Sequence, residues 1–440
     1  MGSAELVAAV RRGDADAVRE LLDAGGDPER CDPADGVPLL CLAVAAYDEP
    51  VAEALLDAGA DPLRPLDGVP GGDPGLPGGD TALTRAVDGG SSTMSVRLLP
   101  ELVRLDADAR AALLARARYW AEADIEAELR RSTGADGPVE RRRVWEEPLR
   151  TSFHESFSLG DGTVRDGHLG VLTVLEERFR MPAPFDELLA RALTRPDRDH
   201  GVWTDAVVHL AGCPGAEDWA AAEALRDHPD RLRRLFAADV LRCLVIGFGG
   251  MFPRSSTVVE KEASEVFLPW AREERDPEVL AQVLRGLSEE AGDSDRSDEI
   301  DAVGLSYVGH PDPRVRREAV ETLRRELTSM PRHKLDAVYA LARDPEPAVR
   351  ERAAHWLTQL REEAPGLTDV LAGLVDDELR ATRVHAARGL ALRGDPRCVE
   401  AERRLRPLDP EGWPDSDLVR AMWRYEEGKV KDSGSAGGWL

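Results

Sequence analysis

Residues 312–323, DPRVRREAVETL, decide the fold because the stretch recurs. Residues 346–357, EPAVRERAAHWL, repeat it after 34 positions, and residues 379–390, LRATRVHAARGL, repeat it after 33 more. Each copy has an arginine at its fifth position, small or apolar residues at its eighth and ninth, and a leucine at its twelfth. Spacings of three and four place the last three positions on one helical face. The pattern therefore predicts one buried helix in each copy, stacked on the next.

A weaker ladder of the same kind extends upstream. Small or apolar residues stand three and four positions before each of its leucines, which are Leu175, Leu210, Leu241 and Leu287. Together the copies predict an array of about six to seven units over residues 166–405. The arginine recurs at Arg234, Arg316, Arg350 and Arg383.

This array resembles the HEAT repeat, in the short form also seen in phycobiliprotein-lyase proteins. The resemblance implies an α-α superhelix of helix pairs. It also implies a structural role for the recurring arginine, which in that family pairs with acidic groups of the neighbouring unit.

A second array begins the chain. Residues 25–28, GGDP, recur as residues 59–62, GADP, 34 positions later. Residues 36–43, GVPLLCLA, and residues 79–86, GDTALTRA, form a second matched pair, with about ten residues inserted between. Each Gly-rich step suits the left-handed end of a helix. The pattern strongly resembles the ankyrin repeat and its Gly-x-Thr-Pro-Leu-His-x-Ala box. The resemblance implies about three ankyrin repeats over residues 1–105.

The two arrays predict an all-α fold, a repeat solenoid in which ankyrin repeats precede a HEAT-like α-α superhelix. Between them, residues 106–165 are expected to form a capping helix and a connector. The helix is predicted over 106–131 and an irregular segment over 153–167. Residues 406–440 are expected to hold a C-terminal helix and a disordered tail, because the last residues are rich in Gly and Ser.

Charge and cysteine content limit the function classes. The chain has 83 acidic and 57 basic residues, a formal charge of −26, which disfavours nucleic acid and anionic membranes as partners. The five cysteines are dispersed, which is typical of a reducing compartment. No secretory signal is evident in the first ten residues, so we expect a cytoplasmic protein. Abundant arginine and alanine with few lysines suggest a bacterial source.

The known motifs of catalysis are missing from the sequence. It has no zinc-binding His-Glu-x-x-His, no phosphate-binding loop and no nucleophile elbow. The paired His-Glu steps of HEAT-type hydroxylases are reduced to a single step, at His154. We therefore expect no catalytic residue, no cofactor and no metal.

The leading hypothesis is a protein–protein interaction scaffold that holds a protein or peptide in its solenoid grooves. The candidate contact residues are exposed turn tips of the first array and acidic residues on the second helices of the second array. Those helices are expected to line the concave face, and acidic contacts there fit a partner with a basic surface. The candidates are Arg30, Asp32, Arg64, Asp67, Asp336 and Asp369.

Two other hypotheses stay open. One is an enzyme or enzyme subunit, lyase-like or hydrolase-like, that binds a small or modified ligand in the HEAT groove. A deep pocket holding several of His200, Trp203, His209 and Glu223 would favour it. The weaker one is a DNA-lesion binder, since some glycosylases share the fold, and it would require a basic stripe on the concave face.

Overall fold

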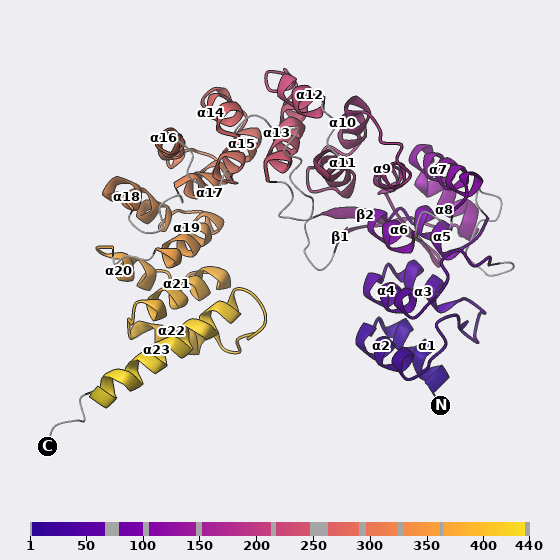
Figure 1. Cartoon of the computed structure of the whole chain (residues 1–440), viewed down its shortest axis with the longest axis horizontal. Coiled ribbons are helices and arrows are strands. Elements are labelled where there is room, and N and C mark those ends of the chain that lie inside the picture. Colours follow the sequence, from indigo (N-terminus) through magenta and orange to yellow (C-terminus); the bar gives the residue numbers. More distant parts are fainter. Residues whose placement is uncertain are drawn as a thin grey trace. The chain divides into compact units, whose positions relative to one another are not determined.

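The computed structural model divides into two compact units, Met1–Asp218 and Trp219–Leu440. Helices dominate both units, with a single three-stranded sheet among the described residues (Figure 1). The residues that the structure describes are 2–66, 79–99, 105–146, 152–212, 217–246, 263–289, 296–323, 330–360 and 364–435.

Unit 1 begins with three antiparallel helix pairs. The second helix of each pair starts at a side-chain cap, since Asp14, Asp48 and Ser91 accept hydrogen bonds from the backbone of the first turn. Apolar residues such as Leu6, Leu39 and Leu83 are fully buried between the pairs. The six helices are α1 (Gly2–Arg12), α2 (Ala15–Asp23), α3 (Leu39–Ala46), α4 (Glu49–Asp57), α5 (Ala82–Asp88) and α6 (Ser92–Leu98).

The single helix expected over residues 106–131 is two helices, α7 (Ala107–Glu122) and α8 (Ile125–Thr133). Asp124 explains the break, because its carboxylate caps α8 by accepting from the backbone of Glu126 and Ala127. The expectation of one continuous amphipathic helix was wrong at this point.

The segment expected to be irregular, residues 153–167, holds two strands of a three-stranded sheet. Strands β1 (Glu140–Trp145), β2 (Phe153–Leu159) and β3 (Gly162–Arg165) pair antiparallel in sequence order. Gly160, with a positive φ of 61°, makes the tight β2–β3 turn. The fold is therefore mostly helical with a small sheet, which corrects the strictly all-α expectation.

Three further helices belong to unit 1, α9 (His168–Arg178), α10 (Phe185–Thr194) and α11 (Gly201–Gly212). Helix α9 packs against α6, α7 and α11. Its buried Val171 and Leu175 join the same core as the first helix pairs. The sheet and the start of α11 meet at an isolated bridge between Phe153 and His200.

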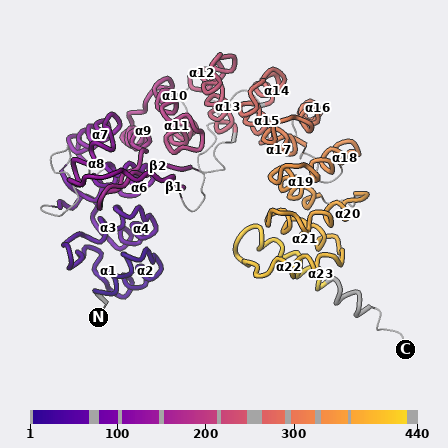
Figure 2. The backbone as a smooth tube through the Cα atoms, turned by 180° about the vertical axis from the view of Figure 1, so that it is seen from behind, coloured from indigo at the N-terminus to yellow at the C-terminus, as the bar shows by residue number. Residues whose placement is uncertain are grey.

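Unit 2 is built from two rows of helices (Figures 1 and 2). The inner row, in which each helix packs on the next, is α13 (Arg231–Ile246), α15 (Pro277–Glu289), α17 (Pro313–Thr322), α19 (Pro347–Gln359), α21 (Arg380–Leu392) and α23 (Asp415–Ser435). The outer helices are α12 (Asp218–Ala224), α14 (Ala263–Glu273), α16 (Ser297–Tyr307), α18 (Arg332–Leu341), α20 (Leu367–Ala372) and α22 (Arg397–Leu405).

The recurring small residues and leucines lie in the core of the inner row. Ala319, Ala353 and Ala386 are fully buried, and so are Leu357 and Leu390. Close packing of α17, α19 and α21 follows from these small side chains. The expected disordered tail is helical as far as Ser435, and residues 436–440 lie outside the described residues.

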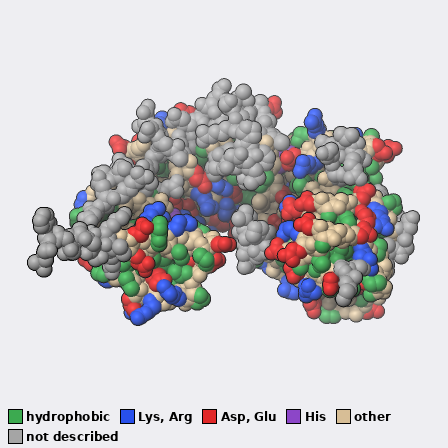
Figure 3. Space-filling model, turned by 60° about the horizontal axis from the view of Figure 1, so that its bottom comes forward, with side chains coloured by type: hydrophobic (Ala, Val, Ile, Leu, Met, Phe, Trp, Pro, Cys, Tyr) green, Lys and Arg blue, Asp and Glu red, His purple; other side chains and the backbone are tan. Residues whose placement is uncertain are grey.

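Basic and acidic side chains are interspersed on the face shown in Figure 3. Ion pairs between arginines and acidic residues recur through both units, so the excess negative charge does not reflect a uniformly acidic surface. None of the described helices has the length and apolarity needed to cross a bilayer.

Candidate functional site

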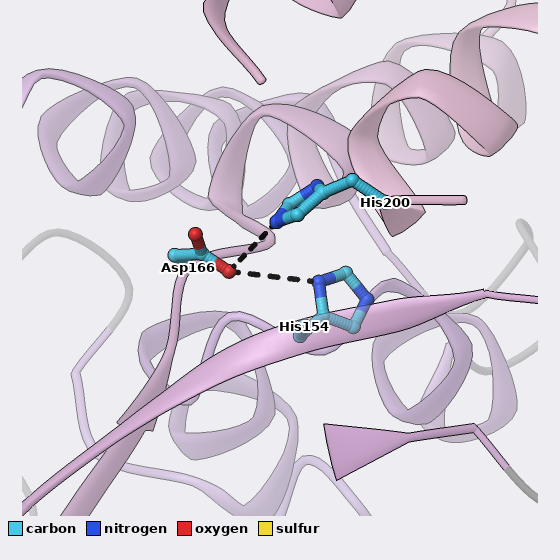
Figure 4. Close-up of side chains that lie close together, drawn as sticks. All are labelled: His154, Asp166 and His200. Carbon is cyan, nitrogen blue, oxygen red and sulfur yellow. Dashed lines mark hydrogen bonds and ion pairs between the residues drawn. The ribbon is translucent and has the colours of Figure 1, made fainter. Parts of the chain in front are cut away.

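Three titratable side chains meet inside unit 1 (Figure 4). His154 comes from β2, Asp166 follows β3, and His200 precedes α11. The backbone N–H of Phe153 donates to the carbonyl of Asp199 at 2.8 Å, which fixes β2 against the start of α11. All three side chains are buried, at 0%, 6% and 2% exposure, so solvent does not reach them.

Asp166 is the centre of this cluster. Its Oδ1 accepts from the backbone N–H of Glu155 at 2.9 Å and from Nε2 of His200 at 3.0 Å. Its Oδ2 accepts from Nε of Arg195 at 2.8 Å. Burial acts to raise the pKa of Asp166, but the hydrogen bond from His200 and the Arg195 charge outweigh it and lower the pKa to about 2. The carboxyl is therefore ionised at neutral pH.

His154 is enclosed by backbone and by a second carboxylate. Its Nε2 donates to Oε1 of Glu146 at 3.1 Å. Its Nδ1 lies 3.9 Å from Oδ1 of Asp166 and is buried without a hydrogen-bond partner. A Cβ on Gly167 or Gly201 would come within 2.6 Å or 2.1 Å of Cε1 of His154. Only glycine at these two positions leaves room for the ring.

The cluster offers three potential metal ligands, whose donor atoms all lie within 4.8 Å of one another. Nδ1 of His154 fits this role, because Nε2 carries the ring proton and Glu146 orients it. His200 does not fit. The N–H of Val202 donates to Nδ1 of His200 at 3.2 Å, so Nε2 holds the ring proton and has no lone pair for a metal. The geometry is that of a hydrogen-bonded network joining β2, β3 and α11.

A further carboxyl lies near this network. Asp205, on α11, has a buried Oδ2 without a hydrogen-bond partner. Burial and the charge of Glu146 raise the pKa of Asp205 to about 7. On the other side, His168 stacks on Trp120 and donates to the carbonyl of Asp88 at 3.0 Å. Burial lowers the pKa of His168 to about 4. Unit 1 thus holds both an ionised Asp166 and an Asp205 whose pKa is raised to about 7.

The first-array candidates are only partly surface residues. Asp32 is 3% exposed and bonds Nε of Arg11 at 2.6 Å, so the expectation of an exposed contact was wrong there. Its carboxylate also closes its own turn through the N–H of Ala34. Arg30 is half-buried, with an unpaired buried Nε. Arg64 is exposed and pairs with Glu29 at 2.7 Å. Asp67 lies outside the described residues.

The second-array candidates lie on the outer row of unit 2. Asp336 is on α18 and pairs with Arg332 at 2.9 Å. Asp369 is on α20 and pairs with Arg397 at 3.0 Å. The expected concave lining by second helices is wrong, because the inner row consists of the helices that carry the recurring arginine (Figure 1). Both aspartates lie on outer helices, α18 and α20.

The inner row carries an aromatic surface that the sequence analysis missed. Trp413, in the loop before α23, is 64% exposed and lies over His355 of α19 and His385 of α21, with ring centroids 6.0 Å and 5.5 Å apart. The two imidazoles contact each other at 4.8 Å. Nε2 of His385 lies 3.3 Å from Glu351. Burial and the neighbouring His385 lower the pKa of His355 to about 4.

Among the described residues, neither the pocket between α21 and α22 nor the small pocket lined in part by Cys41 includes the residues named for an enzymatic pocket. Trp203 is 1% exposed, and His209 lies 3.1 Å from a Glu177 oxygen at the far end of α11 from His200. Glu223 is on α12. Because the His154–Asp166–His200 cluster is buried as well, a substrate cannot reach it in this arrangement.

No family model matches the chain, and no curated protein matches it. Among solved structures, the YibA protein of Escherichia coli is similar at 17% identity, with a TM-score of 0.42, over 54% of this chain and 80% of YibA. An engineered protein is similar at 16% identity, with a TM-score of 0.38, over 96% of this chain and 98% of that one. At these TM-scores the likenesses define neither a fold family nor a function.

Proposed function

We propose that the chain is a cytoplasmic interaction protein, with ankyrin-type repeats followed by HEAT-type repeats, that binds a protein or peptide on the inner row of unit 2. The observation that carries the proposal is Trp413. A large aromatic ring left 64% exposed costs free energy in water, and tryptophan is among the residues that most often dominate protein interfaces.

The surroundings of Trp413 support a partner of definite chemistry. The ring rests on two imidazoles, so it is held in place before binding and loses little conformational freedom. Acidic groups lie beside it, with Glu351 next to His385 and Asp417 paired with Arg388 at 3.3 Å. These features favour a peptide that presents an apolar or aromatic side chain flanked by basic residues.

A matched pair of variants tests the proposal. Trp423, on α23, is 62% exposed, and no aromatic contact holds its ring among the described residues. The full chain, Trp413→Ala and Trp423→Ala would be immobilised and exposed to extract from the source cells. We expect the wild type and Trp423→Ala to retain the same set of proteins. Trp413→Ala should retain at least tenfold less of each of them.

The identified partner is then titrated against the three purified proteins. Equal affinity of Trp413→Ala and the wild type, with unchanged melting temperatures, would overturn the proposal.

A further inference from the structure

The recurring arginines of unit 2 form a ladder with constant geometry. In each of three rungs, Nη1 donates to two backbone carbonyls just before the helix, while Nε and Nη2 hold carboxylate oxygens from the next unit. The rungs are Arg234 with Glu274, at 2.9 and 3.1 Å, Arg316 with Asp344, at 2.6 and 2.7 Å, and Arg350 with Asp377 and Glu378, at 2.6 and 2.9 Å. This confirms the structural pairing that the HEAT resemblance implied for these three arginines.

Arg383 begins a fourth rung that has no acid. Its Nη1 donates to the carbonyls of Asp377 and Glu378 at 2.6 and 3.0 Å, as in the other rungs. Among the described residues, however, no carboxylate lies within ion-pair distance of its guanidinium. Two acids that follow α22 are engaged elsewhere. Asp409 accepts from the backbone N–H of Glu411 at 3.0 Å, and Asp415 binds Arg380 at 2.5 and 2.7 Å.

Arg383 also lines a pocket. The cavity has a volume of about 660 Å³ and lies between the start of α21, the end of α22 and the loop before α23. Its other arginines have acidic partners, Arg380 with Asp415, Arg404 with Asp376 and Arg406 with Glu402. Within the described part of the chain, Arg383 is thus the arginine of this pocket that has no acidic partner. Its Nε and Nη2 groups remain available to bind a carboxylate.

We propose that Arg383 and this pocket bind a carboxylate group supplied by another molecule. The planar fork of a guanidinium matches a carboxylate through two parallel hydrogen bonds, and the other three rungs show this arginine position holding carboxylates. Asp409 and Asp415 also line the pocket, and they repel one bound carboxylate group, which carries a single charge, less than a phosphate group, which carries nearly two charges on one centre. The site does not depend on the binding role proposed for Trp413.

Two sources can supply such a group, a free dicarboxylate or an acidic side chain of a partner. Calorimetric titrations of the full chain at constant ionic strength with glutarate, with an N-acetylated, C-amidated tetraglutamate peptide and with inorganic phosphate distinguish them. We expect saturable binding of glutarate, the peptide or both, with phosphate at least tenfold weaker. Glutarate binding assigns a small-molecule site, and binding of the peptide alone assigns a partner's acidic segment.

Two variants and one control test the residue. Arg383→Gln should weaken binding at least tenfold, and Arg383→Lys, which keeps the charge but not the fork, should also lose most of it. Arg403→Gln removes a 72% exposed arginine of α22 that does not line the pocket, and should bind as the wild type. The proposal is overturned if neither carboxylate binds, if phosphate binds equally well, or if a folded Arg383→Gln or Arg383→Lys binds unchanged.

Discussion

The polar interiors of the two units are organised differently. Unit 1 holds a buried polar network around Asp166, whose members come from β2, from the residue after β3 and from the residue before α11, and which occurs once. Unit 2 distributes its pairs along a ladder in which each arginine bridges to the next repeat. In a repeat array each unit contacts only its neighbours, so a lost rung is a local defect. A central network has no such redundancy, and its loss should affect all of its members.

The largest expected effect is that of Asp166→Ala. It leaves the N–H of Glu155, the Nε2 proton of His200 and Nε of Arg195 without their acceptor. Breaking a buried charged network at one partner costs about 3–5 kcal/mol. Urea unfolding measures the loss, and hydrogen exchange of α11 amides should locate it in unit 1.

The pH dependence sharpens this test. A carboxyl whose pKa is lowered to about 2 stabilises the fold fully above its unfolded pKa, near 4, and loses that contribution as the pH falls through 2. The difference between wild type and Asp166→Ala should therefore shrink below pH 4. Asp161→Ala, at an exposed position in the β2–β3 turn, is the control and should change little. A cost for Asp166→Ala no greater than that of Asp161→Ala would show that the network does not stabilise unit 1.

The second effect is that of Gly201→Ala. Glycine to alanine within a helix usually stabilises it by about 1 kcal/mol. At Gly201 the added Cβ would lie 2.1 Å from Cε1 of His154, so the ring must move and its bond to Glu146 must break. We therefore expect Gly201→Ala to destabilise the fold, lowering the free energy of unfolding by about 1–3 kcal/mol. At Gly137 the nearest atom to an added Cβ is 3.8 Å away, and Gly137→Ala should be tolerated. A melting temperature of Gly201→Ala at or above the wild type would contradict the tight enclosure of His154.

The third effect compares two rungs of the ladder. Arg316→Met removes a guanidinium from Asp344, whose side chain is 6% exposed, and should cost about 1–3 kcal/mol. Arg383→Met removes only two bonds to carbonyls, which Arg316 also makes, and should cost at least about 1 kcal/mol less than Arg316→Met. Both replacements keep a similar apolar stem in the same helical position. If urea unfolding shows the same loss of free energy of unfolding for both variants, the carboxylate partners do not stabilise the ladder.

The sequence was sufficient for features that repeat. Arg316 and Arg350 pair with carboxylates 28 and 27 positions further along the chain, so a repeated pattern revealed one repeated interaction. The break at Asp124 was missed because the apolar period continues through it, although Asp is a typical helix cap. The sheet was missed because β2 alternates weakly, with both Phe153 and His154 buried.

The site of unit 1 carries no repeat signal at all. His154, Asp166 and His200 lie up to 46 positions apart, on a strand and on two loops, and only the tertiary fold brings them together. The single His-Glu step at His154 was considered for metal binding, yet the carboxylates near that ring are Glu146 and Asp166. The chain offered no local pattern by which those partners could be chosen.

The last expected effect concerns Asp205, a buried carboxyl of unit 1 that lacks the arginine which unit 2 supplies at each filled rung. A carboxyl whose pKa rises from about 4 to about 7 on folding stabilises the fold fully below pH 4 and loses that contribution as the pH rises through 7. Asparagine does not titrate. Asp205→Asn should therefore gain stability relative to the wild type between pH 5 and pH 8, by about 2–3 kcal/mol. Urea unfolding at both pH values measures the gain, with Asp161→Asn as the exposed control. A gain that is equal at pH 5 and pH 8 would mean that Asp205 is ionised in the folded chain throughout this range. A cation or a water molecule would then contact its carboxylate, as the ladder arginines contact theirs.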